Sequence, residues 1–346
     1  MRELPEVIES EESLDDLLTE PTDEVVRALA ALDGDLLILG VGGKIGPTLA
    51  RLARRAFDAG DIRRRVIGVS RFSSPEAGGY LRAHGVETVS ADLLEPGALA
   101  RLPDAPNLVF MAGRKFGSTG AESLTWAMNA YVPALVAERY RGSRIVVFST
   151  GNVYPLVPVA SGGATEATPP APVGEYAQSC LGRERLFEHF SELHGTPTTI
   201  LRLNYAIDLR YGVLHDVARR VWAGEPIDLT MGNVNAIWQG DACGAALRCL
   251  ALAKSPPLVL NLTGPETVSV RYLATRFAEI LGRPTPSFVG DEAQTALLSN
   301  ASLAHGLLGY PRVPLERMVR WVAEWVRRGG RTLSKPTHFE ARDGRF

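Results

Sequence analysis

The sequence predicts an α/β fold, in which a doubly wound parallel sheet is joined to a smaller, mostly helical C-terminal lobe. From Asp35 onward, short segments that are apolar throughout alternate with helical segments, which is typical of parallel strands buried on both faces. A turn rich in glycine separates the first of these strands from the first helix. Since connections between parallel strands are right-handed, helices are expected on both faces of one sheet.

The expected elements follow one another along the chain. The first helix of this region spans residues 46–60 and ends at Gly60. Six apolar segments are expected to form the strands, at residues 35–40, 64–70, 86–92, 107–113, 143–150 and 198–204. After about residue 205 helical segments predominate, which predicts the smaller lobe.

Four regions are predicted from this pattern. Residues 1–33 form an acidic extension with a helical pattern near its end, either docked on the core or free to bind a partner. Residues 34–205 form the sheet domain and residues 206–330 the lobe, with the chain able to cross again between them. Residues 331–346, rich in Arg, Lys and Pro, are expected to form a loosely held tail.

Composition argues against several classes of function. Of the 346 residues, 45% are hydrophobic and 22% are charged, as in ordinary globular proteins. A net charge of −2 argues against general binding to nucleic acid, and no apolar run reaches the length of a membrane span. The three unclustered cysteines favour a cytoplasmic location, and the histidines lack the spacing of metal ligands, so no metal site is expected.

The turn rich in glycine carries a chemical signal. Gly40, Gly43 and Gly46 stand at three-residue intervals in "LLILGVGGKIGPTLA", between a strand and a helix. The first glycine permits a tight turn, the second lets backbone N–H groups approach a pyrophosphate, and the third lets the helix pack on the strand. With Lys44 and Ile45 they predict that residues 34–205 form a Rossmann dinucleotide-binding domain. The alternative is a structural turn without a ligand.

The end of the second strand indicates which dinucleotide is bound. A site for NAD usually has an acidic residue here, whereas this chain has Ser70 and Arg71. Because a guanidinium can bind a 2′-phosphate that a carboxylate would repel, the sequence favours NADP(H), with NAD(H) as the alternative. Arg71 could instead stack on the adenine or face solvent.

Further segments resemble the extended short-chain dehydrogenase/reductase family, the NAD(P)-dependent epimerases and dehydratases, from about Asp35 to Gly329. These segments are "SADLLE", "VFMAG", "WAMNAYVPALV", "VVFSTGNVYP" and "TEATPPAPVGEYAQS". The resemblance implies a Rossmann fold with a substrate-binding lobe, and a homodimer. It also implies contacts with the cofactor from Asp92, Leu93, Ala112 and Gly113.

The same resemblance implies the residues of the reaction. Thr150 supplies a catalytic hydroxyl, and Tyr176 is the general acid or base that also contacts the cofactor. Asn129 supports a water that relays protons. Thr150, Asn152 and Asn204 are implied to contact the substrate.

Two positions depart from the family pattern. The family has a lysine four residues after the tyrosine, where this chain has Cys180. The family often has an asparagine three residues after an arginine in the sixth strand, whereas Asn204 follows Arg202 by two. The second departure leaves open whether a nucleotide sugar is bound.

The missing lysine matters because its positive charge lowers the pKa of the tyrosine. An unperturbed tyrosine has a pKa of about 10, and a nearby cation lowers such a value by about 1–3 units. Cys180 either fills the space of the lysine or is a reactive thiol. The replacement charge is expected from Lys115, with Arg114, Arg183 and the oxidised nicotinamide as alternatives. Lys115 could instead be a solvated residue of its loop.

Three functions are compatible with this sequence. The first is an NAD(P)-dependent oxidoreductase, epimerase or dehydratase that acts on a sugar, a nucleotide sugar or a related hydroxylated molecule, and it is preferred because Thr150 and Tyr176 are both present. The second is a dinucleotide sensor that has lost its chemistry. The third is a lyase or isomerase that uses the cofactor only transiently.

Overall fold

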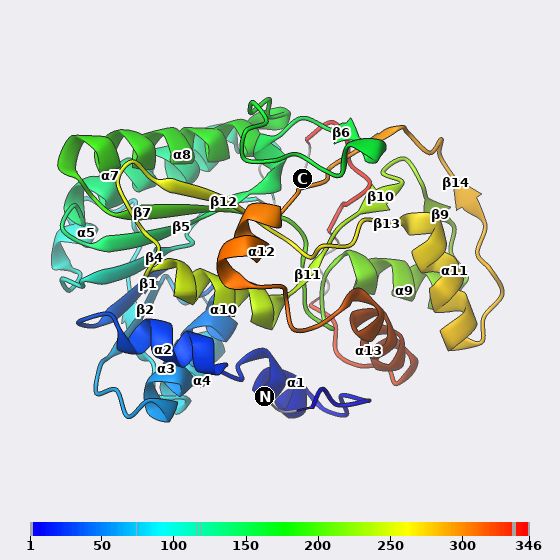
Figure 1. The fold of residues 1–346 in the computed structure, drawn as a ribbon, viewed down its shortest axis with the longest axis horizontal. Helices are drawn as coiled ribbons and strands as arrows, with labels where there is room; N and C mark the ends of the chain where they lie inside the picture. The colour runs from blue at the N-terminus through cyan, green and yellow to red at the C-terminus, as the bar shows by residue number, and fades with distance from the viewer. Residues whose placement is uncertain (1–2, 74, 116, 118, 334–336, 345–346) are drawn as a thin grey trace.

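Seven parallel strands form the central sheet of the computed structural model, which describes residues 3–73, 75–115, 117, 119–333 and 337–344. The strands are β1 (Leu36–Leu39), β2 (Val66–Ser70), β3 (Glu87–Ser90), β4 (Asn107–Phe110), β5 (Arg144–Thr150), β7 (Thr198–Leu203) and β12 (Leu258–Leu262). Their order across the sheet is β12-β7-β5-β4-β1-β2-β3. Figure 1 shows this sheet beside a smaller lobe.

The order of the strands creates a crevice at the centre of the sheet. β1 pairs with β2 on one side and with β4 on the other, and Leu36 is in register with Val66 of β2 and with Asn107 of β4. From this point the chain winds outward in opposite directions. The connections after β1 and β4 therefore diverge at the carboxyl ends of these strands, which is where ligands bind in such sheets.

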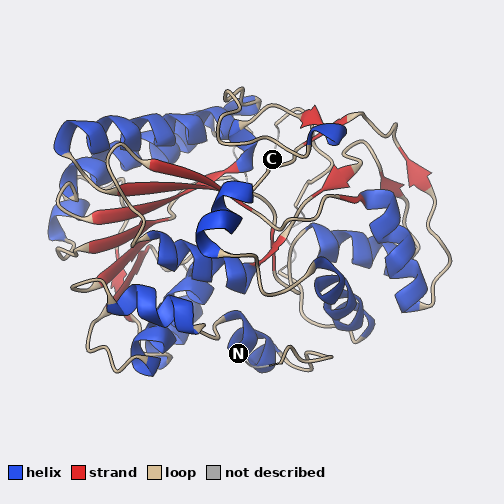
Figure 2. Cartoon of the chain, viewed as in Figure 1, coloured by secondary structure: helices blue, strands red, loops and turns tan. Residues whose placement is uncertain are grey.

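Helices cover both faces of the sheet, as the sequence predicts (Figure 2). On one face α2 (Asp23–Ala30), α3 (Gly46–Ala59) and α10 (Gln239–Cys249) pack with Leu36 and Ile38 of β1. The remaining helix beside them is α4 (Pro75–Ala83).

The opposite face is covered by the helices that follow β3, β4 and β5. α7 (Val132–Arg139) and α8 (Gly174–His194) pack with Leu37 and Leu39 of β1, because successive strand residues point to opposite faces. The shorter elements on this side are α5 (Ala98–Arg101), α6 (Glu122–Trp126) and the π-helical η1 (Ala127–Tyr131).

The smaller lobe has its own apolar core. Its main helices are α9 (Val213–Ala223), α11 (Val270–Leu281) and α13 (Leu315–Arg327). Its short strand pairs are β8 (Ala206–Ile207) with β11 (Ile237–Trp238), β9 (Ile227–Asp228) with β14 (Phe288–Val289), and β10 (Asn233–Val234) with β13 (Val268–Ser269). The remaining elements are β6 (Val157–Pro158), which pairs with β15 (Thr295–Ala296), and η2 (Gly151–Val153), η3 (Val159–Ser161) and α12 (Ser302–Leu308).

The chain returns from the lobe to the sheet domain, a crossing that the predicted division allowed. α10 covers one face of the sheet, and β12 pairs with β7 at the edge of the sheet in the register Leu258↔Thr199. Because residues 206–330 were predicted to form the lobe, β12 was expected to belong to the lobe. The central residue of β12, Leu260, is instead fully buried as part of the main sheet.

The N-terminal segment, residues 3–33, is docked on the core rather than free. It contains a second helix, α1 (Glu11–Leu18), which begins with a capping box between Ser10 and Ser13. Leu14 and Leu18 of α1 pack into the core of the lobe, whereas Val25 of α2 packs against the sheet domain. The structure therefore favours the docked alternative over the partner-binding arm.

The expectation of a loosely held C-terminal tail is wrong for residues 337–344, called the C-terminal segment below. Phe339 is only 2% exposed and packs into the core of the lobe. Arg342 donates hydrogen bonds to the carbonyl oxygens of Thr230 and Thr295. The composition suggested a solvated tail, but the segment contains one aromatic anchor and one arginine whose partners lie far away in the sequence.

In the part of the chain that the structure describes, no helix is both long and apolar enough to span a membrane.

Candidate functional site

A cleft of about 450 Å³ lies at the carboxyl ends of β1, β4 and β5 and is closed on its far side by the lobe. The predicted site residues that line it are Gly40, Gly43, Lys44, Ile45, Gly113, Lys115, Thr150, Asn152, Tyr176 and Asn204. Six other predicted cofactor residues lie outside this lining, namely Gly46, Ser70, Arg71, Asp92, Leu93 and Ala112. A second cavity of about 460 Å³ lies between α1, α10 and α12, but it contains neither the glycine turn nor Tyr176. We therefore assign the chemistry to the first cleft.

The glycine turn, residues 40–46, has the close backbone approaches that its motif predicts. A Cβ on Gly40 would lie 2.4 Å from the backbone nitrogen of Ala112, and one on Gly46 would lie 2.1 Å from the carbonyl oxygen of Val41. A Cβ on Gly43, by contrast, would have its nearest neighbour, the carbonyl oxygen of Gly40, at 3.5 Å. The backbone of Gly43 is therefore not enclosed by other atoms and is open to the cleft. No side chain caps the N-terminus of α3, and the N–H groups there can bind an anion. These features fit the pyrophosphate of a dinucleotide.

The lobe reaches the glycine turn through Tyr211. The ammonium group of Lys44 lies 3.2 Å from the centroid of the Tyr211 ring, which places a cation beside the turn. The side chain of Gln239 donates a hydrogen bond of 2.9 Å to Thr48 in the first turn of α3. These two contacts join the lobe to the glycine turn and to α3, the helix whose N-terminus would bind the pyrophosphate.

The ends of β2 and β3 lie next to the glycine turn. A Cβ on Gly42 would lie 2.4 Å from Oγ of Ser70, so Ser70 directly contacts the turn. The Arg71 guanidinium is 3.9 Å from the carboxylate of Asp92, and these side chains are 69% and 41% exposed. An ion pair this exposed contributes little to stability, so Arg71 remains available to a ligand.

Tyr176 and Thr150 meet in the cleft. Thr150 ends β5, and Tyr176 lies in the first turn of α8, which begins at Gly174. Burial raises the pKa of the Tyr176 hydroxyl far above its ordinary value, while the charge of Arg183 and a hydrogen bond with Thr150 lower it. The tyrosine therefore needs positive charge nearby if it is to act as a base.

Cys180 lies one helical turn after Tyr176 and is completely buried. Burial raises the pKa of its thiol, so the nucleophilic thiolate is disfavoured. It packs within the apolar core of the lobe, beside Tyr176. This geometry favours the alternative in which Cys180 fills space over the alternative of a reactive thiol.

Two cations lie near Tyr176. Arg183, two turns along α8 from Tyr176, is 6% exposed and donates a 2.8 Å hydrogen bond to the carbonyl oxygen of Phe148. Its Nε is buried without a hydrogen-bond partner among the described residues. The ammonium group of Lys115 lies 5.7 Å from the centroid of the Tyr176 ring. Burial lowers the pKa of Lys115 to about 8.

Asn129 lies in the π-helical η1 and is completely buried. Its Oδ1 accepts hydrogen bonds from the backbone nitrogen of Arg114 and from Nη2 of Arg183, at 2.8 and 3.0 Å. Its Nδ2 donates to the Arg114 carbonyl oxygen and to Oγ of Ser179. Because its amide is satisfied by protein groups, a water for proton relay would have to replace one of these bonds. In this structure Asn129 positions the loop of Lys115 and the guanidinium of Arg183.

A buried ion pair lies behind the tyrosine helix, where no functional residue was predicted. Glu184 of α8 is 2.6 Å from Nη2 of Arg202 in β7, and both side chains are almost completely buried. Arg202 also donates a 2.7 Å hydrogen bond to the hydroxyl of Tyr154, which in turn donates to Asn261 of β12. This network fixes α8 against the sheet. An arginine within the apolar strand "TTILRLN" was the signal that could have predicted it.

The lobe supplies cleft residues that sequence reasoning missed. They are Tyr205, Tyr211, Gln239, Thr337, His338 and Ala341. The side chain of the predicted Asn204 donates a 2.8 Å hydrogen bond to Asn235 and is 3% exposed, so little of it faces the cleft. Among the described residues, no group of three or more His, Cys, Asp or Glu side chains is placed to hold a metal ion.

Solved structures share this fold at low sequence identity. MoeE5 in complex with UDP-glucose and NAD is 22% identical, with a TM-score of 0.69 over 86% of this chain and 99% of MoeE5. DesIV, a dTDP-glucose 4,6-dehydratase from Streptomyces venezuelae with NAD and TYD bound, is 22% identical, with a TM-score of 0.71 over 85% and 98% of the two chains. The UDP-glucuronic acid 4-epimerase from Bacillus cereus, in complex with UDP-glucuronic acid and NAD, is 19% identical, with a TM-score of 0.69 over 85% and 99%.

Sequence comparisons add the family. A comparison with curated protein sequences gives no match. The model of the NAD dependent epimerase/dehydratase family matches residues 36–231, which is more than half of the chain. The match includes the glycine turn, Thr150 and Tyr176, and it confirms the resemblance found in the sequence motifs. The chain therefore belongs to the NAD-dependent epimerase/dehydratase family, a family of enzymes.

Proposed function

We propose that this protein is an NAD(P)-dependent oxidoreductase, epimerase or dehydratase that acts on a sugar, a nucleotide sugar or a related hydroxylated small molecule. The observation that carries this proposal is the pair of Tyr176 and Thr150 in the same cleft as the glycine turn. A phenol beside an alcohol can hold a substrate hydroxyl and exchange its proton. A bound nicotinamide would accept hydride from the carbon that bears that hydroxyl.

In this proposal Tyr176 takes the proton and Thr150 orients the substrate oxygen. The base must be a phenolate, which burial disfavours, so neighbouring cations decide how much of it is present. Arg183 supplies a permanent positive charge and Lys115 a second one. Asn129 holds both in place through its bonds to Arg183 and to the backbone of Arg114. Together they replace the lysine of the family.

The cofactor preference that we propose is NADP(H). Ser70 and Arg71 stand at the end of β2, and the nearest carboxylate, that of Asp92, is held 3.9 Å from the Arg71 guanidinium. A 2′-phosphate beside this guanidinium would form a charge-assisted hydrogen bond. The related structures contain NAD, so the preference separates this chain from them.

The sensor alternative is not favoured. Its second motivation, besides the missing lysine, was an N-terminal extension free to bind a partner, and that segment is docked on the core.

We place the protein in the cytoplasm because its three cysteines are buried and free. We also propose a homodimer, since the large apolar side chains of Leu124 and Trp126 in α6 and of Tyr131 in η1 are exposed, and both elements contact α8.

The proposal is tested by incubating the protein and NADP⁺ with a panel of sugars, sugar acids, sugar phosphates and nucleotide sugars. We expect reduction of the cofactor or rearrangement of one panel member. Tyr176→Phe should lower kcat by at least about 100-fold, as is usual for loss of a general base, while the affinity for NADP⁺ is retained. Full turnover by Tyr176→Phe would reject the assigned base.

A further inference from the structure

The C-terminal segment forms the wall of the cleft on the side of the lobe. Thr337, His338 and Ala341 line the cleft. Gly344, near the end of the segment, contacts the backbone just before α8, where a Cβ on Gly344 would lie 2.2 Å from the carbonyl oxygen of Val173. The segment therefore runs along the cleft to the start of the helix that carries Tyr176.

Side-chain contacts on both sides of His338 hold this wall in place. The backbone nitrogen and Oγ1 of Thr337 donate hydrogen bonds of 2.8 and 2.6 Å to Oδ2 of Asp216. Phe339 is buried in the core of the lobe. Arg342 donates a 2.6 Å hydrogen bond from Nη2 to Oγ1 of Thr295. These contacts fix the wall to the lobe.

His338 differs from its neighbours in the segment. Thr337 and Phe339 are 4% and 2% exposed, whereas the side chain of His338 is exposed and lines the cleft. Its backbone has a φ of +52°, in the left-handed region that residues other than glycine rarely adopt. Such a conformation persists when the surrounding contacts impose it, and it is concentrated at functional sites. The anchored neighbours therefore present an imidazole to the cleft.

The charge of the cleft indicates what this imidazole would bind. Among the described residues that line the cleft none is Asp or Glu, whereas Lys44, Arg114, Lys115 and Arg183 are basic. Lys44 belongs to the glycine turn, where the pyrophosphate is expected. Arg183 and Lys115 lie near Tyr176, and Arg114 precedes Lys115 in the loop after β4. These three residues therefore lie at the end of the cleft that carries Tyr176. An anionic group on the substrate would be attracted to this end.

We propose that His338 binds an anionic group of the substrate, either a carboxylate or a phosphate. The inference rests on the proposed function and narrows its class of substrates. In the imidazole, a ring N–H donates a hydrogen bond to the anion. No other residue of the C-terminal segment combines an exposed side chain with a place in the lining of the cleft.

The test compares the wild-type protein with His338→Asn and His338→Ala. Asparagine tolerates the left-handed backbone, so His338→Asn separates loss of the imidazole from loss of folding. The probes are D-glucuronate, D-glucose 6-phosphate, D-galactose and UDP-glucose, titrated calorimetrically into the complex with NADP⁺ and assayed for turnover. The affinity for NADP⁺ and the thermal melting of each variant are measured as controls.

We expect the wild type to bind glucuronate or glucose 6-phosphate more tightly than uncharged galactose, and the better of the two identifies the anion. In both variants this affinity should fall about 10–100-fold, as expected for a hydrogen bond to a charged group, with the affinity for NADP⁺ unchanged. Equal affinity in the wild type and the variants, or no binding of either anion, would overturn the inference. Turnover of an anionic probe at the same rate in the wild type and both variants would do so and leave the proposed function intact, whereas failure to bind any dinucleotide would reject the proposed function.

Discussion

Tyr176 lies in a part of the cleft where burial works against its ionised form. The charge of Arg183 counters this effect, and we propose that Lys115, whose ammonium group lies 5.7 Å from the ring centroid, does so as well. Arg183 comes from the same face of α8, seven residues after the tyrosine, and Lys115 comes from the loop after β4. Their roles differ, because the guanidinium remains charged at every relevant pH while the lysine can lose its charge.

We predict that activity depends on the charge of Lys115. Burial lowers the pKa of this lysine to about 8. It is therefore cationic below that pH and neutral above it, so kcat/KM should fall as the pH rises through about 8. Lys115→Met should lower kcat/KM at neutral pH by about tenfold or more, since a cation beside a phenol shifts its pKa by about 1–3 units. The measurement is the pH profile of kcat/KM.

Two further variants decide the cause of that profile. Lys115→Arg keeps the charge, so the fall near pH 8 should disappear while activity at neutral pH is retained. Lys254→Met removes an exposed lysine that does not line the cleft and should leave the profile unchanged. A profile that is identical in the wild type and Lys115→Met would show that Lys115 has no part in the reaction.

The placement of Tyr176 and of the glycine turn in one cleft could be predicted because the spacing within each motif is local. Tyr176, Cys180 and Arg183 occupy one face of a helix, and the glycine turn is a single continuous motif. The Glu184–Arg202 pair and the place of His338 could not be predicted, since each depends on segments that only the tertiary fold brings together. Arg71 was predicted to meet a phosphate, and whether it does so remains a prediction.

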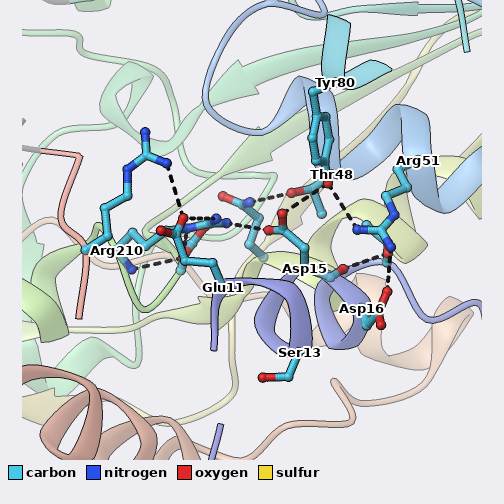
Figure 3. Close-up of polar contacts among 12 residues, drawn as sticks. Glu11, Ser13, Asp15, Asp16, Thr48, Arg51, Tyr80 and Arg210 are labelled. Atoms are coloured by element: carbon cyan, nitrogen blue, oxygen red, sulfur yellow. Dashed lines mark hydrogen bonds and ion pairs between the residues drawn. The ribbon is translucent and has the colours of Figure 1, made fainter. Parts of the chain in front are cut away.

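Helix α1 connects the two parts of the molecule through its acidic side chains, as Figure 3 shows. Oδ1 of Asp15 accepts a 2.9 Å hydrogen bond from Arg210, and its Oδ2 accepts one of 3.1 Å from the hydroxyl of Tyr80 in α4. Asp16 pairs with Arg51 of α3. Since Arg210 precedes the Tyr211 that contacts Lys44, α1 supports the glycine turn from outside the cleft.

We predict that Asp15→Asn lowers the free energy of unfolding by about 1–3 kcal/mol, because it weakens hydrogen bonds to a charged, largely buried arginine. The affinity for the dinucleotide should fall with it, by a few-fold. Denaturant unfolding and calorimetry measure the two effects. The matched control is Glu24→Gln, whose partner Arg27 is 70% exposed, and it should change stability by less than about 1 kcal/mol. Equal effects of the two substitutions would contradict the supporting role of α1.

Most elements of the sheet domain could be predicted because each has a strong local pattern. The six expected strands all form, and each ends within a few residues of the expected position. β12 was assigned to the lobe because its short apolar run does not reveal where it pairs. α1 was not expected to be a helix because its sequence is dominated by acidic residues, although Leu14 and Leu18 give it an apolar side.

The proposed dimer would bury the exposed apolar side chains of α6 and η1. Leu124, Trp126 and Tyr131 are 40%, 38% and 57% exposed, and large apolar surfaces of this kind are typical of interfaces. We predict a dimer in light scattering, and a monomer for Tyr131→Glu because a carboxylate would be buried at the interface. Tyr272→Glu, at a tyrosine that is 56% exposed on α11, should remain a dimer. A monomeric wild type would contradict this arrangement.

At the scale of the whole molecule, we propose that one dinucleotide binds between the sheet and the lobe. The glycine turn, Lys44, Ser70 and Arg71 are predicted to contact its phosphates and ribose, and Tyr176 lines the same cleft as the glycine turn. Calorimetric titration of the purified protein with NADP⁺, NADPH, NAD⁺ and NADH measures this binding directly. We predict one dinucleotide per chain, with NADP(H) bound more tightly than NAD(H). Absence of binding by all four, with no nucleotide carried through purification, would contradict the central claim.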